Sequence, residues 1–271
     1  MSEVDTTHRL TQMEQFIHQL HIKPMSDRER LFMDTFQMTK EELDSMRFLG
    51  MFDIQADVES LEKQFDRLQR LDYESYIQTE LRRLQLAYPS DKPIRLELFM
   101  LDEHDEFVKN KLGGVSAFTD WNGKMCFIVQ ADGGVKTTLK SVIFHEYHHH
   151  LRMCKLNMTE GNETLLDRLV LEGLAEHFVR IELGDAYMGP YKSVLSEEEA
   201  QKLWNTRFRH HIDDRGEMAD SYIFGNKEMG LPFWGGYSLG YHLVEWYMNE
   251  NSEWTIEELT ELPSKSFLLE R

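Results

Sequence analysis

The chain has 271 residues, of which 41% are hydrophobic, so it is long enough to bury one large core or two smaller ones. Its formal net charge of −18 at pH 7 repels nucleic acid and anionic lipid, and we expect neither as a partner. No uncharged apolar run reaches the roughly 18 residues that a membrane-spanning helix needs, so we expect no membrane span.

Residues 26–88 carry the periodicity of amphipathic helices. Apolar residues recur at three- and four-residue steps, as in Leu61, Phe65 and Leu68, and the stretch contains no proline and only one glycine, Gly50. This pattern predicts two or three helices. We interpret their many charged residues as solvated helix faces rather than as binding sites.

A small sheet is predicted after these helices. Residues 94–100 alternate with period two for part of their length, as a half-buried strand does. Two glycines precede a second candidate strand at residues 115–119, and an Asn-Gly turn signal at 122–123 separates it from a third at residues 125–130. The second and third strands are therefore expected to form a hairpin.

The next predicted helix, with Thr137 or Thr138 as its cap, carries the residues with the clearest chemistry. It contains the pattern HExxH, formed by His145, Glu146 and His149. Histidines four positions apart lie one above the other on a helix face and can bind one metal ion. The glutamate between them projects beside the metal, where it can deprotonate a bound water. The pattern therefore predicts a zinc hydrolase.

Chance and composition offer a simpler explanation of this pattern. With 12 histidines in the chain, about 0.05 HExxH patterns are expected at random, and the bunching of four histidines here raises that figure. An exposed histidine-rich helix without a metal is the alternative. His148 and His150 point away from the face of the other two and are interpreted as structural or surface groups.

A third ligand distinguishes the classes of HExxH protein. The metzincin class requires glycine at position 152 and histidine at position 155, where this chain has Arg152 and Lys155, so that class is excluded. In the gluzincin arrangement the third ligand is a glutamate on a later helix. A helix predicted at residues 163–183 carries Glu172 and Glu176 one turn apart.

Both glutamates can face the helix that carries HExxH. We assign Glu172 to zinc and Glu176 to a hydrogen bond with an N–H of His145. If zinc were retained without Glu172, the ligand would instead be Glu176 or His177.

The HExxH at residues 145–149, followed by Glu-Gly-Leu-Ala at residues 172–175, resembles the HExxH…NEGxA pattern of gluzincin metallopeptidases, the clan of thermolysin. The small size, the helical first part and the segment at residues 236–241 are similar to the YjaZ-like family of predicted Zn-dependent proteases, known mainly as a domain of unknown function. The family resemblance extends from about residue 94 to residue 244. One departure is Leu171, where many members of the clan have asparagine.

The resemblance also bears on the kind of peptidase. Aminopeptidases of the clan carry a Gly-x-Met-Glu-Asn loop whose glutamate holds the free amino group of the substrate. The corresponding residues 113–118 contain no glutamate, which favours endopeptidase action. The resemblance implies that the strand at residues 115–119 lies along the cleft, where an extended peptide can pair with its edge.

Zinc hydrolases also need a donor for the oxyanion that develops on the scissile carbonyl. Our candidate is Tyr237, which lies in a glycine-rich C-terminal segment. The alternatives are Tyr241, His242, His210 and His211. The tyrosines of this segment can equally serve only to pack a helix.

These patterns together predict an α+β fold with a zincin-like core, made of a small sheet, the HExxH helix and the glutamate helix, and with additional N- and C-terminal helices. We divide the chain into a helical region at residues 1–92, the core with the metal site at residues 93–185, and a mostly helical region at residues 186–271 that completes the cleft. The helix at residues 163–183 is expected to stop at Gly184 and the Gly-Pro pair at residues 189–190. The last region is expected to be broken by a looser polar segment around residues 210–226 and by the glycine pair at residues 235–236.

The predicted function is a zinc-dependent peptidase with one Zn²⁺ per chain, bound by His145, His149 and Glu172, with Glu146 as general base and Tyr237 as oxyanion donor. The expected partner is a peptide or protein substrate, and the oligomeric state is left open. Two alternatives are an inactive zinc-dependent binding or regulatory protein and a zinc hydrolase that acts on non-peptide substrates.

The cysteine content and the N-terminal residues are used to predict the cellular compartment. Cys126 and Cys154 are the only two, and neither has a zinc-finger spacing. The N-terminus also lacks the basic start and apolar run of a signal peptide. We therefore expect a cytoplasmic protein.

Overall fold

The computed structural model describes residues 4–6, 8–159 and 161–268. Contacts divide the chain into two compact units, Met1–Leu86 with Lys92–Ile143 and Ala87–Asp91 with Phe144–Arg271. The α+β class is confirmed, because a four-stranded sheet accompanies the helices. The division into three regions stays a prediction. No helix in the described ranges is both long enough and apolar enough to span a bilayer.

The sheet lies in the first unit, in the order β1-β2-β4-β3. Its strands are β1 (Val4–Thr6), β2 (Ile94–Met100), β3 (Val115–Thr119) and β4 (Lys124–Val129). β2 pairs in parallel with both β1 and β4, and β3 and β4 form the expected antiparallel hairpin. Gly123 has φ +85°, the left-handed conformation that favours glycine in this turn.

The burial of β2 differs from the prediction of a half-buried strand. Only Arg95 is exposed, and even the carboxylate of Glu97 is buried and bonded to Arg9 at 2.9 Å. The reason is that β2 is an internal strand, flanked by β1 and β4 and contacted by helices α1 (Arg9–Leu20) and α4 (Val58–Leu71). Periodicity describes strands with one solvated face and fails for a strand covered on both.

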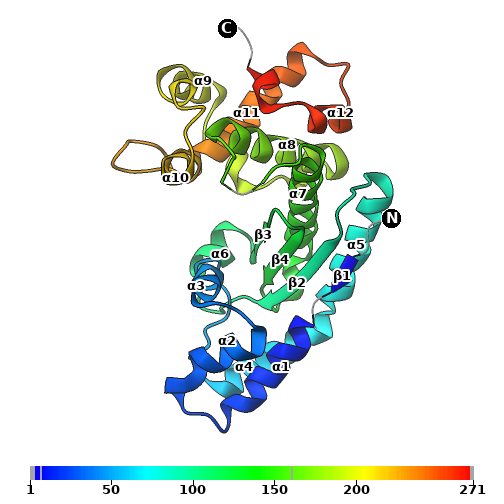
Figure 1. Cartoon of the computed structure of the whole chain (residues 1–271), viewed down its shortest axis with the longest axis vertical. Helices are drawn as coiled ribbons and strands as arrows, with labels where there is room; N and C mark the ends of the chain where they lie inside the picture. The colour runs from blue at the N-terminus through cyan, green and yellow to red at the C-terminus, as the bar shows by residue number, and fades with distance from the viewer. Residues whose placement is uncertain (1–3, 7, 160, 269–271) are drawn as a thin grey trace. The chain divides into compact units, whose positions relative to one another are not determined.

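Four helices form between residues 26 and 88 rather than two or three. They are α2 (Arg28–Phe36), α3 (Lys40–Phe48), α4 and α5 (Tyr73–Ala87). The extra break follows α2, where Gln37 adopts φ +54°, a left-handed conformation that ends a helix. Figure 1 shows α1, α2 and α4 together at one end of the sheet. Helix α6 (Glu106–Lys111) contacts β3.

The start of the helix that carries HExxH also differs from the prediction. Neither predicted threonine caps α7 (Lys136–Lys155); instead the Asp132 carboxylate accepts a hydrogen bond from the Gly134 N–H at 2.7 Å. The two glycines form a short 3-10 turn, η2 (Gly133–Val135), that leads directly into the helix. The division between the two units falls inside α7, between residues 143 and 144.

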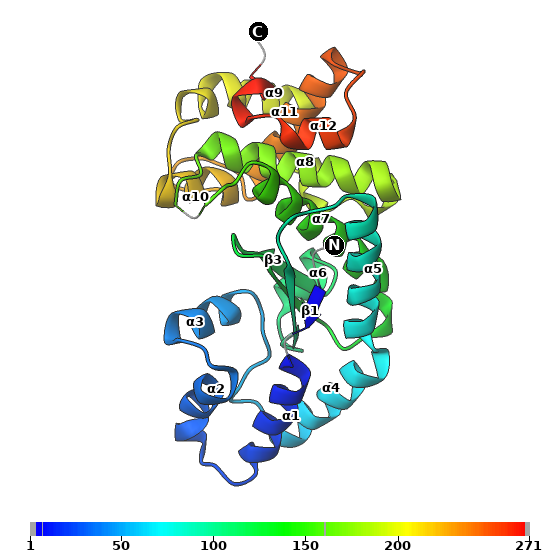
Figure 2. The same cartoon turned by 45° about the vertical axis from the view of Figure 1, so that its right-hand side comes forward.

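The second unit is built around α8 (Leu165–Leu183) and α11 (Gly235–Glu250), which pack against each other (Figure 2). A Cβ on Gly173 of α8 would lie 2.1 Å from the carbonyl oxygen of Gly240 on α11, and a Cβ on Gly240 would lie 2.2 Å from the carbonyl oxygen of Leu169. These two glycines therefore allow the helix backbones to touch. The contact brings the second turn of α11 beside the first half and middle of α8.

Two expectations for the C-terminal part are wrong. The segment around residues 210–226, expected to be loose, contains α10 (Gly216–Phe224), and the glycine pair at residues 235–236 begins α11 instead of interrupting a helix. A Cβ on Gly236 would lie 2.5 Å from the Cα of Ile223. The glycine therefore serves close packing of α10 on α11. The remaining helices are α9 (Glu197–Thr206) and α12 (Ile256–Glu261).

Candidate metal centre

The two histidines of the HExxH pattern converge on one carboxylate. Their rings lie 4.5 Å apart on neighbouring turns of α7. One oxygen of Glu172, Oε2, lies 3.2 Å from Nε2 of His145 and 3.5 Å from Nε2 of His149. All three residues belong to the second unit. Two imidazole nitrogens and a carboxylate oxygen thus face one point, which is a donor set that zinc accepts.

Glu176 orients one of these histidines. Its Oε1 lies 2.9 Å from Nδ1 of His145, and its Oε2 accepts a hydrogen bond from the backbone N–H of Gly189 at 2.9 Å. When the ring is neutral, a carboxylate at Nδ1 holds the proton on that nitrogen and leaves Nε2 with its lone pair for a metal. This contact joins the two residues for which a hydrogen bond was predicted, and the Glu176 side chain is almost fully buried.

Glu146 lies beside the two histidines and is 6% exposed. His145, Glu146 and His149 each offer one ligand atom, and the three atoms lie within 4.8 Å of one another. A carboxylate at this distance can reach a water molecule held between the histidines.

The charges of the site are coupled. Burial by itself would lower the pKa of His145, but its hydrogen bonds with Glu172 and Glu176 outweigh burial and raise that pKa well above the usual range. Burial would raise the pKa of Glu172, yet the attraction of His149 and the bond with His145 hold it well below its usual range. Glu172 is therefore ionised at neutral pH, as a ligand for a cation must be.

The other histidines of the run have different partners. Nε2 of His148 lies 3.0 Å from Oγ1 of Thr260, and Nε2 of His150 lies 2.8 Å from Oγ of Ser90. Both rings are buried and contact residues outside the candidate site, which is typical of structural groups. His149 contrasts with His145, because its buried Nδ1 has no hydrogen-bond partner among the described residues.

Tyr237 lies in the first turn of α11, close enough to the site for its charges to act on the phenol. Burial, followed by the charge of Glu172, raises the pKa of Tyr237 well above the usual range. The hydroxyl therefore remains a donor at neutral pH.

The other groups considered as oxyanion donors are committed elsewhere or lie on the surface. The Tyr241 hydroxyl contacts Arg180 and Glu245, Nε2 of His242 contacts the carbonyl of Leu195, Nδ1 of His211 contacts Asp214, and His210 is exposed.

One residue at the site is absent from the sequence-based set. Tyr191, in the 3-10 helix η4 (Pro190–Ser193), has its ring centroid 6.5 Å from that of His145 and stacks on Tyr237 at 4.9 Å with an interplanar angle of 26°. The preceding Gly-Pro pair was interpreted only as the end of a helix. A tyrosine directly after such a pair, downstream of a metal-binding glutamate, is the signal that could have identified it.

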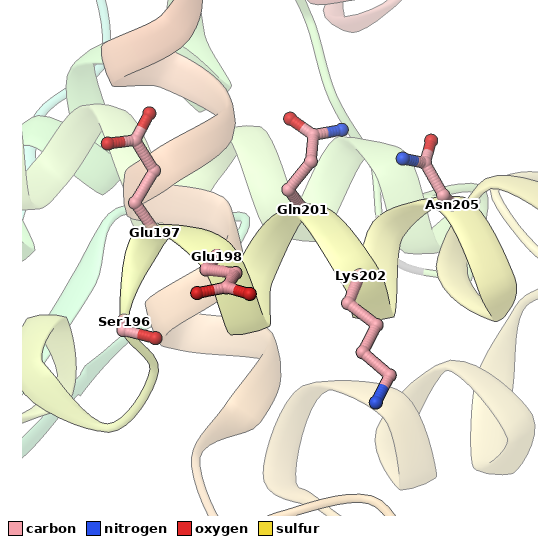
Figure 3. Close-up of a pocket in the computed structure, with 6 residues that line it drawn as sticks. All are labelled: Ser196, Glu197, Glu198, Gln201, Lys202 and Asn205. Atoms are coloured by element: carbon pink, nitrogen blue, oxygen red, sulfur yellow. The ribbon is translucent and has the colours of Figure 1, made fainter.

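A hollow of this unit lies on α9 and shares no residue with the candidate metal centre. Figure 3 shows its six lining residues, Ser196, Glu197, Glu198, Gln201, Lys202 and Asn205. It is open to solvent, and its side chains point in different directions along one helix rather than toward one point. Nothing in it suggests a catalytic site.

Comparisons with known proteins agree with this geometry. The sequence pattern of the family described as "Predicted Zn-dependent protease (DUF2268)" matches residues 73–269. The chain is 28% identical to the uncharacterized protein YjfC of Bacillus subtilis over 82% of its own length and 77% of that protein. It is 27% identical to the uncharacterized protein YjaZ of the same organism, over 81% of each chain. No solved structure matches it significantly.

Proposed function

The chain belongs to the family of predicted Zn-dependent proteases, and we propose that it hydrolyses peptide bonds with one zinc ion bound by His145, His149 and Glu172. The observation that carries the proposal is the position of Glu172 Oε2, within 3.5 Å of Nε2 of both histidines. A helix with two histidines and a second helix with a glutamate form the core of a gluzincin. We accordingly propose a zincin-like core for this unit.

Glu172 fits the third ligand position better than its neighbours. Both oxygens of Glu176 are engaged, by His145 and by the N–H of Gly189. Nε2 of His177 is bonded to the carbonyl of Tyr241. Glu146 lies as close as a ligand, but a carboxylate placed between the two histidines is also where a general base is needed. We therefore assign Glu172 to zinc and Glu146 to the base.

The chemistry follows from these assignments. When bound, zinc polarises the substrate carbonyl and lowers the pKa of an attacking water. Glu146 takes a proton from that water and returns it to the leaving nitrogen. Tyr237 donates a hydrogen bond to the oxyanion, since its hydroxyl stays protonated at neutral pH. Glu176 keeps His145 in the tautomer that offers Nε2.

Endopeptidase action is favoured over aminopeptidase action by the sequence of residues 113–118. Residues 113–118 contain no glutamate that could hold a free amino group. We propose a peptide or protein as substrate and the cytoplasm as location. Neither cysteine forms a disulfide, which agrees with a reducing compartment.

The test begins with metal content. Purified wild type should contain one zinc per chain by elemental analysis, and Glu172→Ala should lose it or bind it far more weakly. Glu198→Ala, which removes an exposed carboxylate of α9, serves as the control and should keep its zinc. Absence of zinc from carefully prepared wild type would refute the proposal.

Activity is then measured on casein, short peptides and simple esters side by side. Glu146→Gln should retain zinc and lose hydrolysis, because an amide cannot accept the proton. Full activity of this variant would exclude Glu146 as the base. Zinc binding without hydrolysis in wild type would indicate a binding or regulatory protein, and activity on esters alone would indicate a non-peptide hydrolase.

A further inference from the structure

The turn that carries Tyr191 is attached to the metal centre through Glu176. The N–H of Gly189 donates to Glu176 Oε2 at 2.9 Å, while Glu176 Oε1 contacts Nδ1 of His145 at 2.9 Å. A Cβ on Gly189 would lie 2.6 Å from the Tyr191 ring and 3.0 Å from Glu176 Oε1. Glycine thus allows the ring to pack directly against its own turn. The carboxylate of Glu176 therefore contacts both His145 and the turn that carries Tyr191.

The ring of Tyr191 is fixed by aromatic neighbours on a second side. It stacks on Tyr237 at 4.9 Å and meets Trp234 edge to face at 5.0 Å. Trp234 holds φ +59°, a left-handed backbone that costs energy for a bulky residue and marks a constrained segment. The constrained start of α11 therefore presents two aromatic rings to Tyr191.

The hydroxyls of Tyr191 and Tyr237 remain available to a bound substrate. Neither hydroxyl makes a hydrogen bond with a described residue, and neither is among the buried polar atoms that lack a partner, so both oxygens are accessible although the side chains are partly buried. A tyrosine hydroxyl keeps its proton at neutral pH, because its ordinary pKa is about 10, so it can donate to an oxyanion.

From this geometry we infer that Tyr191 is a second oxyanion donor, which binds the tetrahedral centre of the substrate beside Tyr237 and is positioned by Glu176. The inference rests on the proposed peptidase function. Two donors share the charge that develops on a single oxygen. The loss of one such donor typically costs about 10²- to 10³-fold in kcat.

Glu176 acts as a positioning residue in this arrangement. Its carboxylate accepts from two N–H donors at once, that of His145 and that of Gly189. In Glu176→Gln the amide has a single oxygen, so one N–H must face an NH₂ group. The turn of Tyr191 should then shift even in molecules that retain zinc.

The test uses the full-length zinc-loaded chain and a peptide phosphonamidate, whose tetrahedral phosphorus imitates the transition state. Tyr191→Phe removes only the hydroxyl and should bind the probe about tenfold or more weakly, with unchanged zinc content and melting temperature. Tyr237→Phe should behave alike. Tyr241→Phe is the matched control, since its hydroxyl is bonded to Arg180 and Glu245, and it should bind the probe as wild type does.

A double-mutant cycle tests the role of Glu176. If Glu176 positions the phenol, Tyr191→Phe should weaken probe binding less in the Glu176→Gln background than in wild type. Additive effects would refute the positioning role. Unchanged probe affinity in zinc-loaded Tyr191→Phe would refute the donor role and leave the peptidase proposal intact. A wild type that binds neither zinc nor probe would refute both.

Discussion

Replacing Gly173 by alanine adds one methyl group at the point where the backbones of α8 and α11 touch. The new Cβ would lie 2.1 Å from the carbonyl oxygen of Gly240, 2.5 Å from its carbonyl carbon and 2.8 Å from Cγ2 of Val244. Two of the three obstacles are backbone atoms, which cannot rotate away. The two helices must therefore separate by about 1 Å to restore ordinary contact distances.

Two opposing effects determine the size of the change. Alanine in a helix interior is favoured over glycine by about 1 kcal/mol. Overpacking costs about 1–3 kcal/mol and more where the backbone must move, so we take about 3 kcal/mol here. The free energy of unfolding should then fall by about 2 kcal/mol. For a domain of this size that lowers Tm by about 4–8 °C.

Urea and thermal unfolding followed by tryptophan fluorescence measure this change. Of the five tryptophans, only Trp121 lies outside the second unit, so the signal reports mainly on the unit that contains Gly173. Gly133→Ala is the control, because its Cβ would meet only Cδ2 of Leu71, at 3.8 Å. A Gly173→Ala protein as stable as wild type, or more stable, would show that the helices are not in backbone contact.

Two further predictions concern buried groups of the second unit. Burial, followed by the charge of Arg180, lowers the pKa of His177 from 6.5 to about 4, so the folded protein holds fewer protons there than the unfolded chain. The neutral, buried His177 ring contributes about 3 kcal/mol to stability above pH 6.5, and this contribution is lost as the pH falls toward 4. The free energy of unfolding of metal-free wild type, measured in urea, should therefore fall with pH in this window, and that of His177→Gln should not. An equal slope in both proteins would contradict this. Arg152 is fully buried and donates hydrogen bonds to the carbonyls of Thr260 and Leu262. Arg152→Met should therefore lower the free energy of unfolding by about 3 kcal/mol and expose residues near 260 to proteolysis. Unchanged protease resistance would show that Arg152 does not hold this segment in place.

Local patterns were sufficient for much of the fold. The strands at residues 94–100 and 115–119 have the predicted bounds, and the third begins and ends one residue earlier than predicted. Side-chain periodicity and an Asn-Gly turn are properties of neighbouring residues, so the sequence reveals them directly. The prediction failed where glycine pairs served packing, as at residues 235–236, because a glycine required for a close helix contact looks the same in a sequence as one that ends a helix.

The candidate metal centre also combines features that the sequence reveals with features that only the tertiary structure decides. The spacing of His145, Glu146 and His149 on one helix is a local feature, and it predicted their convergence. Glu172 and Glu176 could be proposed from their helix, but the tertiary structure decides which oxygen meets which nitrogen. The position of Tyr191 is purely tertiary, since it depends on a turn bonded to Glu176 and a ring stacked on Tyr237. The sequence alone determined which donor groups the candidate site contains, because the spacing of residues along a helix fixes which of them share a face. Only the packing of α8, η4 and α11 decided what surrounds them, because contacts between distant segments leave no periodic signal in the chain.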